Sequence, residues 1–173
     1  LLKVENIPGR LEVINVGQPF TVVVDYAHTP ESLESLLSFY RPLTNGKLIL
    51  VFGATGGGRD KAKRPTMGAV AAKYADNIVV TDDDPYTEDR MTIIEQVAAG
   101  VGRTEGKGLW KVLGRREAIS IAISMAGDQD TVLIAGKGCE PIQIVGEERI
   151  PWDDREVVRE ILTKSQVPNP NYQ

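Results

Sequence analysis

Polar and glycine-rich segments follow the apolar runs of this chain, at the points where each run gives way to a helical pattern. The two clearest examples read DYAHTP at residues 25–30 and GATGGGRD at residues 53–60. In an open α/β sheet, ligands bind at the carboxyl ends of the parallel strands, where such segments lie. The alternation therefore predicts an α/β domain with a ligand site at one edge of its sheet.

The spacing of apolar residues predicts the order of the elements. Strands are expected at 20–24, 47–52, 77–80, 110–113, 131–135 and 142–145, and helices at 30–40, 65–75, 92–101 and 118–125. Asp153 or Asp154 is expected to cap a last helix that ends at Leu162. This interleaving predicts a three-layer, Rossmann-like α/β fold with a mostly parallel, doubly wound sheet and helices on both faces. A hairpin-like return at 146–148 indicates an antiparallel edge.

Composition narrows the class of protein. With 173 residues, of which 42% are hydrophobic, the chain is long enough for one domain, which we expect at residues 1–165 with a frayed tail at 166–173. The net charge of −4 argues against nucleic acid and membrane surfaces as partners. A lone Cys139, no long apolar run and no leader predict a cytoplasmic protein without membrane insertion. Because the chain begins at Leu1 and residues 7–10 read as a connection, we expect a fragment of a longer protein.

Two of the loops carry opposite charge. Three glycines at 56–58 precede Arg59, Lys61, Lys63 and Arg64, a pattern that suits an anionic ligand or, alternatively, a flexible loop before a solvated basic helix start. Residues 82–84 are three adjacent aspartates, which predict either a helix-capping turn or a pocket for an ammonium group or a metal. The segment GKGCE at 136–140 adds one more carboxylate at the end of an apolar run.

Five segments together resemble the C-terminal domain of the Mur ligases. They read PGR at 8–10, DYAHTP at 25–30, GGRDKAKRP at 57–65, TDDDP at 81–85 and GKGCE at 136–140. The resemblance runs in order from about residue 8 to 162. It is closest to the branch that adds a diamino acid to UDP-N-acetylmuramoyl-L-alanyl-D-glutamate (UDP-MurNAc-dipeptide) in peptidoglycan synthesis.

The resemblance implies an ATP-dependent, amide-forming ligase. In that family ATP converts the substrate carboxylate to an acyl phosphate, which the amine of the incoming amino acid attacks. ATP and Mg are then held mainly by an upstream domain, because the chain has no G-x-x-x-x-G-K-[ST] motif. The chain alone is expected to be inactive, with the remaining domains of the same ligase as its partners.

The resemblance also assigns residues. Arg10, Asp25 and His28 match positions that face the nucleotide, and we expect ligand contact or loop support from His28 rather than proton transfer. The remaining matches concern the incoming amino acid: Arg59 for its carboxylate, Asp83, Asp84 and Tyr86 in the selectivity motif, and Gly136 and Glu140 for the far end of its side chain. No catalytic residue and no metal ligand is expected in this chain.

The sequence departs from the family pattern at three positions, and two of them bear on the choice of amino acid. Tyr86 stands where enzymes for meso-diaminopimelate carry an arginine, and a neutral phenol cannot replace that ion pair. Asp84 replaces an asparagine and adds negative charge, which favours a terminal ammonium. Lysine thereby becomes a credible substrate beside meso-diaminopimelate. Cys139, which replaces a histidine, is interpreted as a small substitute rather than a catalytic thiol.

A second hypothesis is a stand-alone binding module that keeps this fold without catalysis. A phosphate-binding G-x-x-x-x-G-K-[ST] motif encoded upstream would favour the ligase, and a native start codon near Leu1 would favour the module. A nicotinamide dehydrogenase is a distant third, because no dinucleotide fingerprint follows the first strand.

Overall fold

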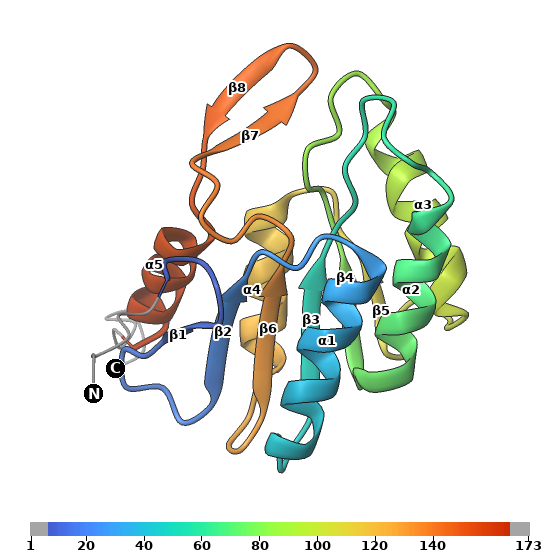
Figure 1. The fold of residues 1–173 in the computed structure, drawn as a ribbon. Helices are drawn as coiled ribbons and strands as arrows, with labels where there is room; N and C mark the ends of the chain where they lie inside the picture. The colour runs from blue at the N-terminus through green and yellow to red at the C-terminus, as the bar shows by residue number, and fades with distance from the viewer. Residues whose placement is uncertain (1–6, 167–173) are drawn as a thin grey trace, which may run out of the picture.

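The computed structural model describes residues 7–166 and contains one six-stranded sheet with helices on both faces (Figure 1). The strand order is β1-β2-β6-β3-β4-β5. The strands are β1 (Glu12–Ile14), β2 (Thr21–Asp25), β3 (Leu48–Phe52), β4 (Asn77–Val80), β5 (Leu109–Lys111) and β6 (Thr131–Ala135). The helices are α1 (Pro30–Tyr40), α2 (Lys63–Tyr74), α3 (Arg90–Val101), α4 (Arg115–Met125) and α5 (Asp154–Gln166), with a 3-10 turn at Arg41–Leu43.

Strands β2 to β6 run parallel, which confirms the predicted doubly wound sheet. The antiparallel edge exists, but β1 forms it by pairing with β2, and the sequence did not predict this short strand. The expected hairpin is β7 (Ile142–Val145) with β8 (Glu148–Pro151), and it forms a separate two-stranded sheet. Its placement at the edge of the main sheet was therefore wrong. Figure 1 shows the hairpin above the carboxyl ends of the parallel strands.

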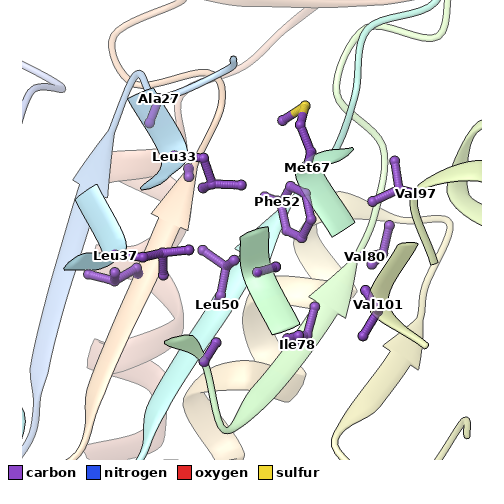
Figure 2. Packing of buried hydrophobic residues seen from close by; sticks show 14 of the residues in the cluster. Ala27, Leu33, Leu37, Leu50, Phe52, Met67, Ile78, Val80, Val97 and Val101 are labelled. Carbon is purple, nitrogen blue, oxygen red and sulfur yellow. The ribbon is translucent and has the colours of Figure 1, made fainter. Parts of the chain in front are cut away.

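The central strands are buried because both faces of the sheet are covered. Alternate side chains of each strand point to opposite faces, so Val23 packs under helices α1 to α3 while Val22 and Val24 pack under α4 and α5. Figure 2 shows the first of these two cores, with Phe52 between helix and sheet. Strands buried on both faces read as continuous apolar runs, which is why β3 and β6 were visible in the sequence.

Predicted boundaries differ from observed ones at several helix ends, most of all at the end of α5, which runs to Gln166 instead of the predicted Leu162. Helix α1 begins and ends as predicted, with Thr29 as its cap and Pro30 at the first position. Helices α3 and α4 begin two and three residues before the predicted 92 and 118, because each starts with charged residues (Arg90 and residues 115–117) that fall outside the apolar pattern. Of the predicted tail, Gln166 ends α5, and 167–173 lie outside the described residues. Within 7–166 no helix is long and apolar enough to cross a bilayer.

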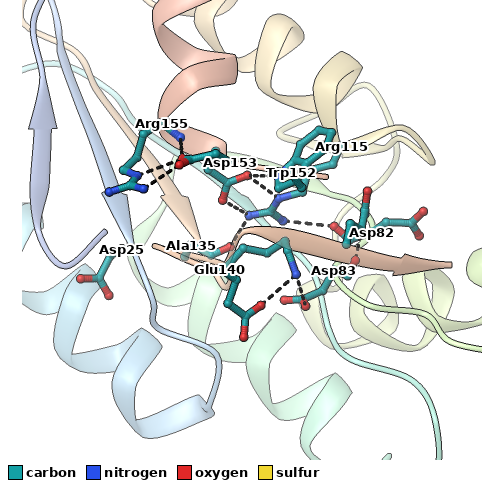
Figure 3. Close-up of polar contacts among 12 residues, drawn as sticks. Asp25, Asp82, Asp83, Arg115, Ala135, Glu140, Trp152, Asp153 and Arg155 are labelled. Atoms are coloured by element: carbon teal, nitrogen blue, oxygen red, sulfur yellow. Dashed lines mark hydrogen bonds and ion pairs between the residues drawn. The ribbon is translucent and has the colours of Figure 1, made fainter. Parts of the chain in front are cut away.

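A fully buried ion pair joins the second layer of helices to the sheet. Both oxygens of Asp154 accept from Arg115, at 2.8 and 2.6 Å, and the indole of Trp152 donates to the same carboxylate. Arg115 also donates to the backbone carbonyls of Ala135, the last residue of β6, and Asp82, in the loop after β4 (Figure 3). One guanidinium therefore fixes α4, α5, the end of β6 and the loop after β4 relative to one another.

We predict that Asp154→Asn lowers the free energy of unfolding by about 3–5 kcal/mol, because it leaves the buried charge of Arg115 uncompensated. The matched control is Glu160→Gln, which breaks the exposed pair of Arg116 and Glu160 between the same two helices. That change should cost about 0–1 kcal/mol. Urea denaturation of both variants measures the difference, and equal losses would contradict the role given to the buried pair.

Helices α2 and α3 pack closely at Gly100, where the absence of a side chain lets their backbones approach. A methyl group added to Gly100 would lie 1.8 Å from the carbonyl oxygen of Pro65. Gly100→Ala is therefore expected to destabilise the fold by about 1–3 kcal/mol through overpacking, although alanine is the better helix former by about 1 kcal/mol. Gly127→Ala, whose methyl would meet nothing closer than 3.8 Å, is the control. A Gly100→Ala variant with an unchanged denaturation midpoint would show that the helices separate at little cost.

Candidate functional site

The loops that follow β2, β3, β4 and β6 converge on one pocket at the carboxyl edge of the sheet. Its volume is about 220 Å³. The pocket is lined by Tyr26, His28, Thr29, Thr55, Arg59, Lys63, Asp83, Asp84, Tyr86, Gly136 and Glu140. The strands are parallel, so their carboxyl ends share one edge, and the predicted convergence of these loops is confirmed.

All six residues that the sequence assigned to an amino-acid ligand lie in this lining, together with His28. Arg10 and Asp25 are not in the lining. The carboxylate of Asp25 accepts the backbone N–H groups of Leu11 and Ala27, each at 2.8 Å, and so holds the N-terminal segment against the end of β2. The guanidinium of Arg10 lies over the ring of Tyr26, 5.2 Å from its centre. Of the three residues expected to face a nucleotide, Arg10 and Asp25 thus lie beside the pocket and His28 lies in its lining.

Three carboxylates form one side of the pocket. Ligand atoms of Asp83, Asp84 and Glu140 lie within 4.8 Å of one another, a spacing that would suit a metal ion. The protein places its own cation there: the Nζ of Lys137 is 2.9 Å from Asp84, 2.8 Å from Glu140 and 4.0 Å from Asp83. We call these four side chains the acidic cluster. Figure 3 shows Asp83 and Glu140 close together in this cluster.

Lys137 is the residue that the sequence reasoning missed. Its motif was identified, but the charge of Asp84 was treated as uncompensated, whereas Asp84 is paired with this lysine. A signal was present in the sequence: three adjacent aspartates need nearby cations, and Lys137 lies between two glycines in a loop at the same edge. Tyr26 was also missed; its hydroxyl donates to Glu140 at 3.0 Å.

Asp83 is the least compensated member of the acidic cluster. Its side chain is 5% exposed, and no donor within residues 7–166 lies at hydrogen-bonding distance from its carboxylate. Burial raises the pKa of Asp83 above its ordinary value, although the charges of Arg115 and Lys137 oppose the rise. Its charge is thus only partly compensated where it lines the pocket, so Asp83 is suited to receive a ligand cation.

Positive charge lies on the glycine-rich side of the pocket. Of the four basic residues there, Arg59 and Lys63 line the pocket, and within the described chain the side chain of Arg59 has no ion-pair partner. Lys61 and Arg64 instead bind Glu88. Each of the two predicted alternatives thus applies to part of this segment. Arg59 and Lys63 face the pocket, where they could bind an anion, whereas Lys61 and Arg64 stabilise the loop through Glu88.

Tyr86 connects the loop after β4 to the hairpin. It adopts a left-handed backbone with φ +51°, donates its N–H to Ile144 and accepts from Gly146. Its ring covers Gly57, where an added methyl would lie 2.7 Å away. The phenol thus forms a rigid neutral wall of the pocket.

His28 is held by its own loop. One ring nitrogen, Nδ1, lies 2.9 Å from the carbonyl oxygen of Tyr26, and the carbonyl of His28 accepts from Lys63. Its ring lies 4.6 Å from the ring of Tyr26. This geometry combines loop support with a position in the pocket lining.

The ion pairs of Glu88 predict a pH dependence of stability. The guanidinium of Arg64 and the ammonium of Lys61 lower the pKa of Glu88 from 4.5 to about 2. A lowered folded-state pKa stabilises the fold above pH 4.5, and this contribution is lost as the pH falls towards about 2. We expect Glu88→Gln to lower the melting temperature at pH 7 and to reduce its fall between pH 5 and 3. Parallel melting curves of the two proteins over that range would contradict the assignment.

Comparison with known proteins identifies the same family that the sequence motifs resemble. The model of the family described as "Mur ligase, glutamate ligase domain" matches residues 9–138. The UDP-N-acetylmuramoyl-L-alanyl-D-glutamate--2,6-diaminopimelate ligase of Syntrophomonas wolfei is 48% identical over 94% of this chain and 33% of its own length. The chain thus spans about a third of the length of the curated relatives it matches.

Solved structures of related ligases share the fold of this chain. A UDP-N-acetylmuramoyl-L-alanyl-D-glutamate--2,6-diaminopimelate ligase is similar with a TM-score of 0.85 and 35% identity, over 96% of this chain and 34% of that one. A Mycobacterium tuberculosis folylpolyglutamate synthase complexed with ADP and AMPPCP shares the fold at 21% identity and a TM-score of 0.58, over 77% of this chain and 30% of that one. The family match and the pocket geometry lead to one conclusion: the chain belongs to the Mur ligase family and corresponds to its glutamate ligase domain.

Proposed function

We propose that this chain is the C-terminal, amino-acid-binding domain of an ATP-dependent ligase that adds a diamino acid to UDP-MurNAc-dipeptide in the cytoplasm. The reaction forms an amide through an acyl phosphate. ATP and Mg are held mainly by the other domains of the same ligase, and this domain closes over them. The chain alone does not turn over.

One observation carries the proposal: a single pocket holds unpaired positive charge on one side and carboxylates on the other. A free diamino acid has a carboxylate and ammonium groups at separate ends. In the proposed pose, Arg59 binds the α-carboxylate in a charge-assisted pair, and Asp83 receives an ammonium of the side chain. Gly136 leaves room beside Asp83, because an added methyl there would lie 2.7 Å from its carboxylate.

The nucleotide side of the proposal rests on Arg10, Asp25 and His28. Arg10 is exposed and suits phosphate oxygens, and His28 faces the pocket. Each oxygen of Asp25 has one backbone donor and a lone pair left for a ribose hydroxyl. We propose that all three contact ATP carried by the neighbouring domain.

The diamino acid is lysine or meso-diaminopimelate. The relative from Syntrophomonas wolfei is named for 2,6-diaminopimelate, which favours that substrate. The neutral ring of Tyr86 in the pocket lining favours a side chain without a second carboxylate. The two observations oppose each other, and a substrate panel decides between them.

The test measures phosphate release from ATP by the complete ligase that contains this chain. We expect release only when UDP-MurNAc-dipeptide and one of lysine, ornithine or meso-diaminopimelate are both present, and none from residues 1–173 alone. Release that is identical with and without every amino acid would refute the ligase. Binding of an amino acid without any turnover of the complete protein would support the non-catalytic module.

The variant Arg59→Gln tests whether Arg59 binds the incoming amino acid. Arg59→Gln removes a charged hydrogen bond, which is worth about 1.5–3 kcal/mol, so the KM for the amino acid should rise about 10- to 100-fold with a smaller change in the KM for ATP. Lys47→Gln, at the opposite edge of the sheet, changes charge equally and should leave both constants unaltered. An equal effect of both variants would contradict the assignment of Arg59.

A further inference from the structure

Lys137 is fully buried and joins two of the loops that form the pocket. Its ammonium donates to Asp84 in the loop after β4 and to Glu140 in its own loop after β6. Burial by itself lowers the pKa of Lys137, but the charges of the surrounding carboxylates outweigh it and the pKa is raised. The lysine is therefore a permanent positive charge inside the acidic cluster.

The backbone fixes where this lysine points. Gly136 and Gly138 on either side of it have φ values of +116° and +52°, which side chains rarely adopt. Gly138 also lies against the N-terminal segment, where an added methyl would be 2.6 Å from the carbonyl oxygen of Gly9. The loop is thus held from both sides, and the Lys137 side chain is directed under the pocket rather than into solvent.

The hydrogen bonds of Lys137 decide which carboxylate remains available. Asp84 Oδ1 accepts from Lys137 and from the backbone N–H of Ile144. Both oxygens of Glu140 are used, one by Lys137 and one by Tyr26. In the described chain, Asp83 alone of the three lacks a donor within hydrogen-bonding distance. Lys137, with the N–H of Ile144 and the hydroxyl of Tyr26, therefore engages two of the three carboxylates and leaves Asp83 as the one without a donor in residues 7–166.

We propose that Lys137 is a positioning and specificity-determining residue, which orients Asp84 and Glu140 and sets the charge that the far end of the incoming amino acid meets. The inference rests on the proposed function of this pocket. Lys137 does not contact the ligand; it acts through the carboxylates that do. Its charge reduces the repulsion that a second carboxylate on the ligand would meet there, and so keeps meso-diaminopimelate admissible although Tyr86 cannot pair with it.

The experiment compares kcat/KM for lysine and for meso-diaminopimelate in the complete ligase. Lys137→Gln makes the cluster more negative by one charge, so the lysine-to-diaminopimelate ratio should rise about tenfold or more. Adding Asp84→Asn to that variant removes one negative charge and should return the ratio towards the wild-type value. Lys107→Gln, an exposed lysine away from the pocket, is the matched control and should leave the ratio unchanged.

The ratio distinguishes specificity from structural support. A folded Lys137→Gln protein that loses activity equally with both amino acids, or that keeps the wild-type ratio, overturns the proposal. If Lys137→Gln does not fold, as judged by circular dichroism, Asp84→Asn alone decides. It shifts the charge in the opposite direction, so the ratio must fall about tenfold, and an unchanged ratio overturns the proposal.

Product formation by the wild-type ligase tests the proposed function on which the role of Lys137 rests. Wild-type ligase that forms product with neither amino acid contradicts the proposed function itself, and the inference with it. Wild-type ligase that forms product, beside a Lys137→Gln protein of unaltered preference, contradicts only the role of Lys137.

Discussion

The three adjacent aspartates at the end of β4 can exist in a buried loop only because cations from elsewhere in the chain compensate them. Asp82 is paired with Arg90, and Asp84 is paired with Lys137. Asp83 receives only the longer-range attraction of Arg115 and Lys137. Uncompensated carboxylates at this spacing would repel one another and take up protons. Helices α3 and α4 and the loop after β6 thus supply the cations that these aspartates require.

The same arrangement separates support from binding. Arg115 and Asp154 are buried beneath the pocket and join helices to strand ends, while Arg59 and Asp83 line the pocket with little or no pairing inside the described chain. Fully paired charges hold the scaffold rigid. Incompletely paired ones are available to a ligand, and the opposite charges on the two sides of this pocket fit a zwitterionic amino acid.

Much of the fold could be predicted because its signals are local. Segments rich in apolar residues predicted the five parallel strands, and Thr29 with Pro30 predicted the start of α1. Two elements could not be placed in this way. Strand β1 has three residues, with Val13 exposed, so no periodic pattern marks it. The hairpin was predicted, but its place depends on contacts of Tyr86 with Ile144, which are far apart in the sequence.

The sequence by itself determined the order of the loops and the chemistry that each one contributes, because residue types and their spacing along the chain are local properties. Only the tertiary structure decided which charges are paired. Lys137 lies more than fifty residues from Asp84, and Arg64 is buried against Glu88 although it looks like its neighbour Lys63 in the sequence. Ion pairing depends on distance and burial in three dimensions, and these are set when the sheet brings the ends of its strands together.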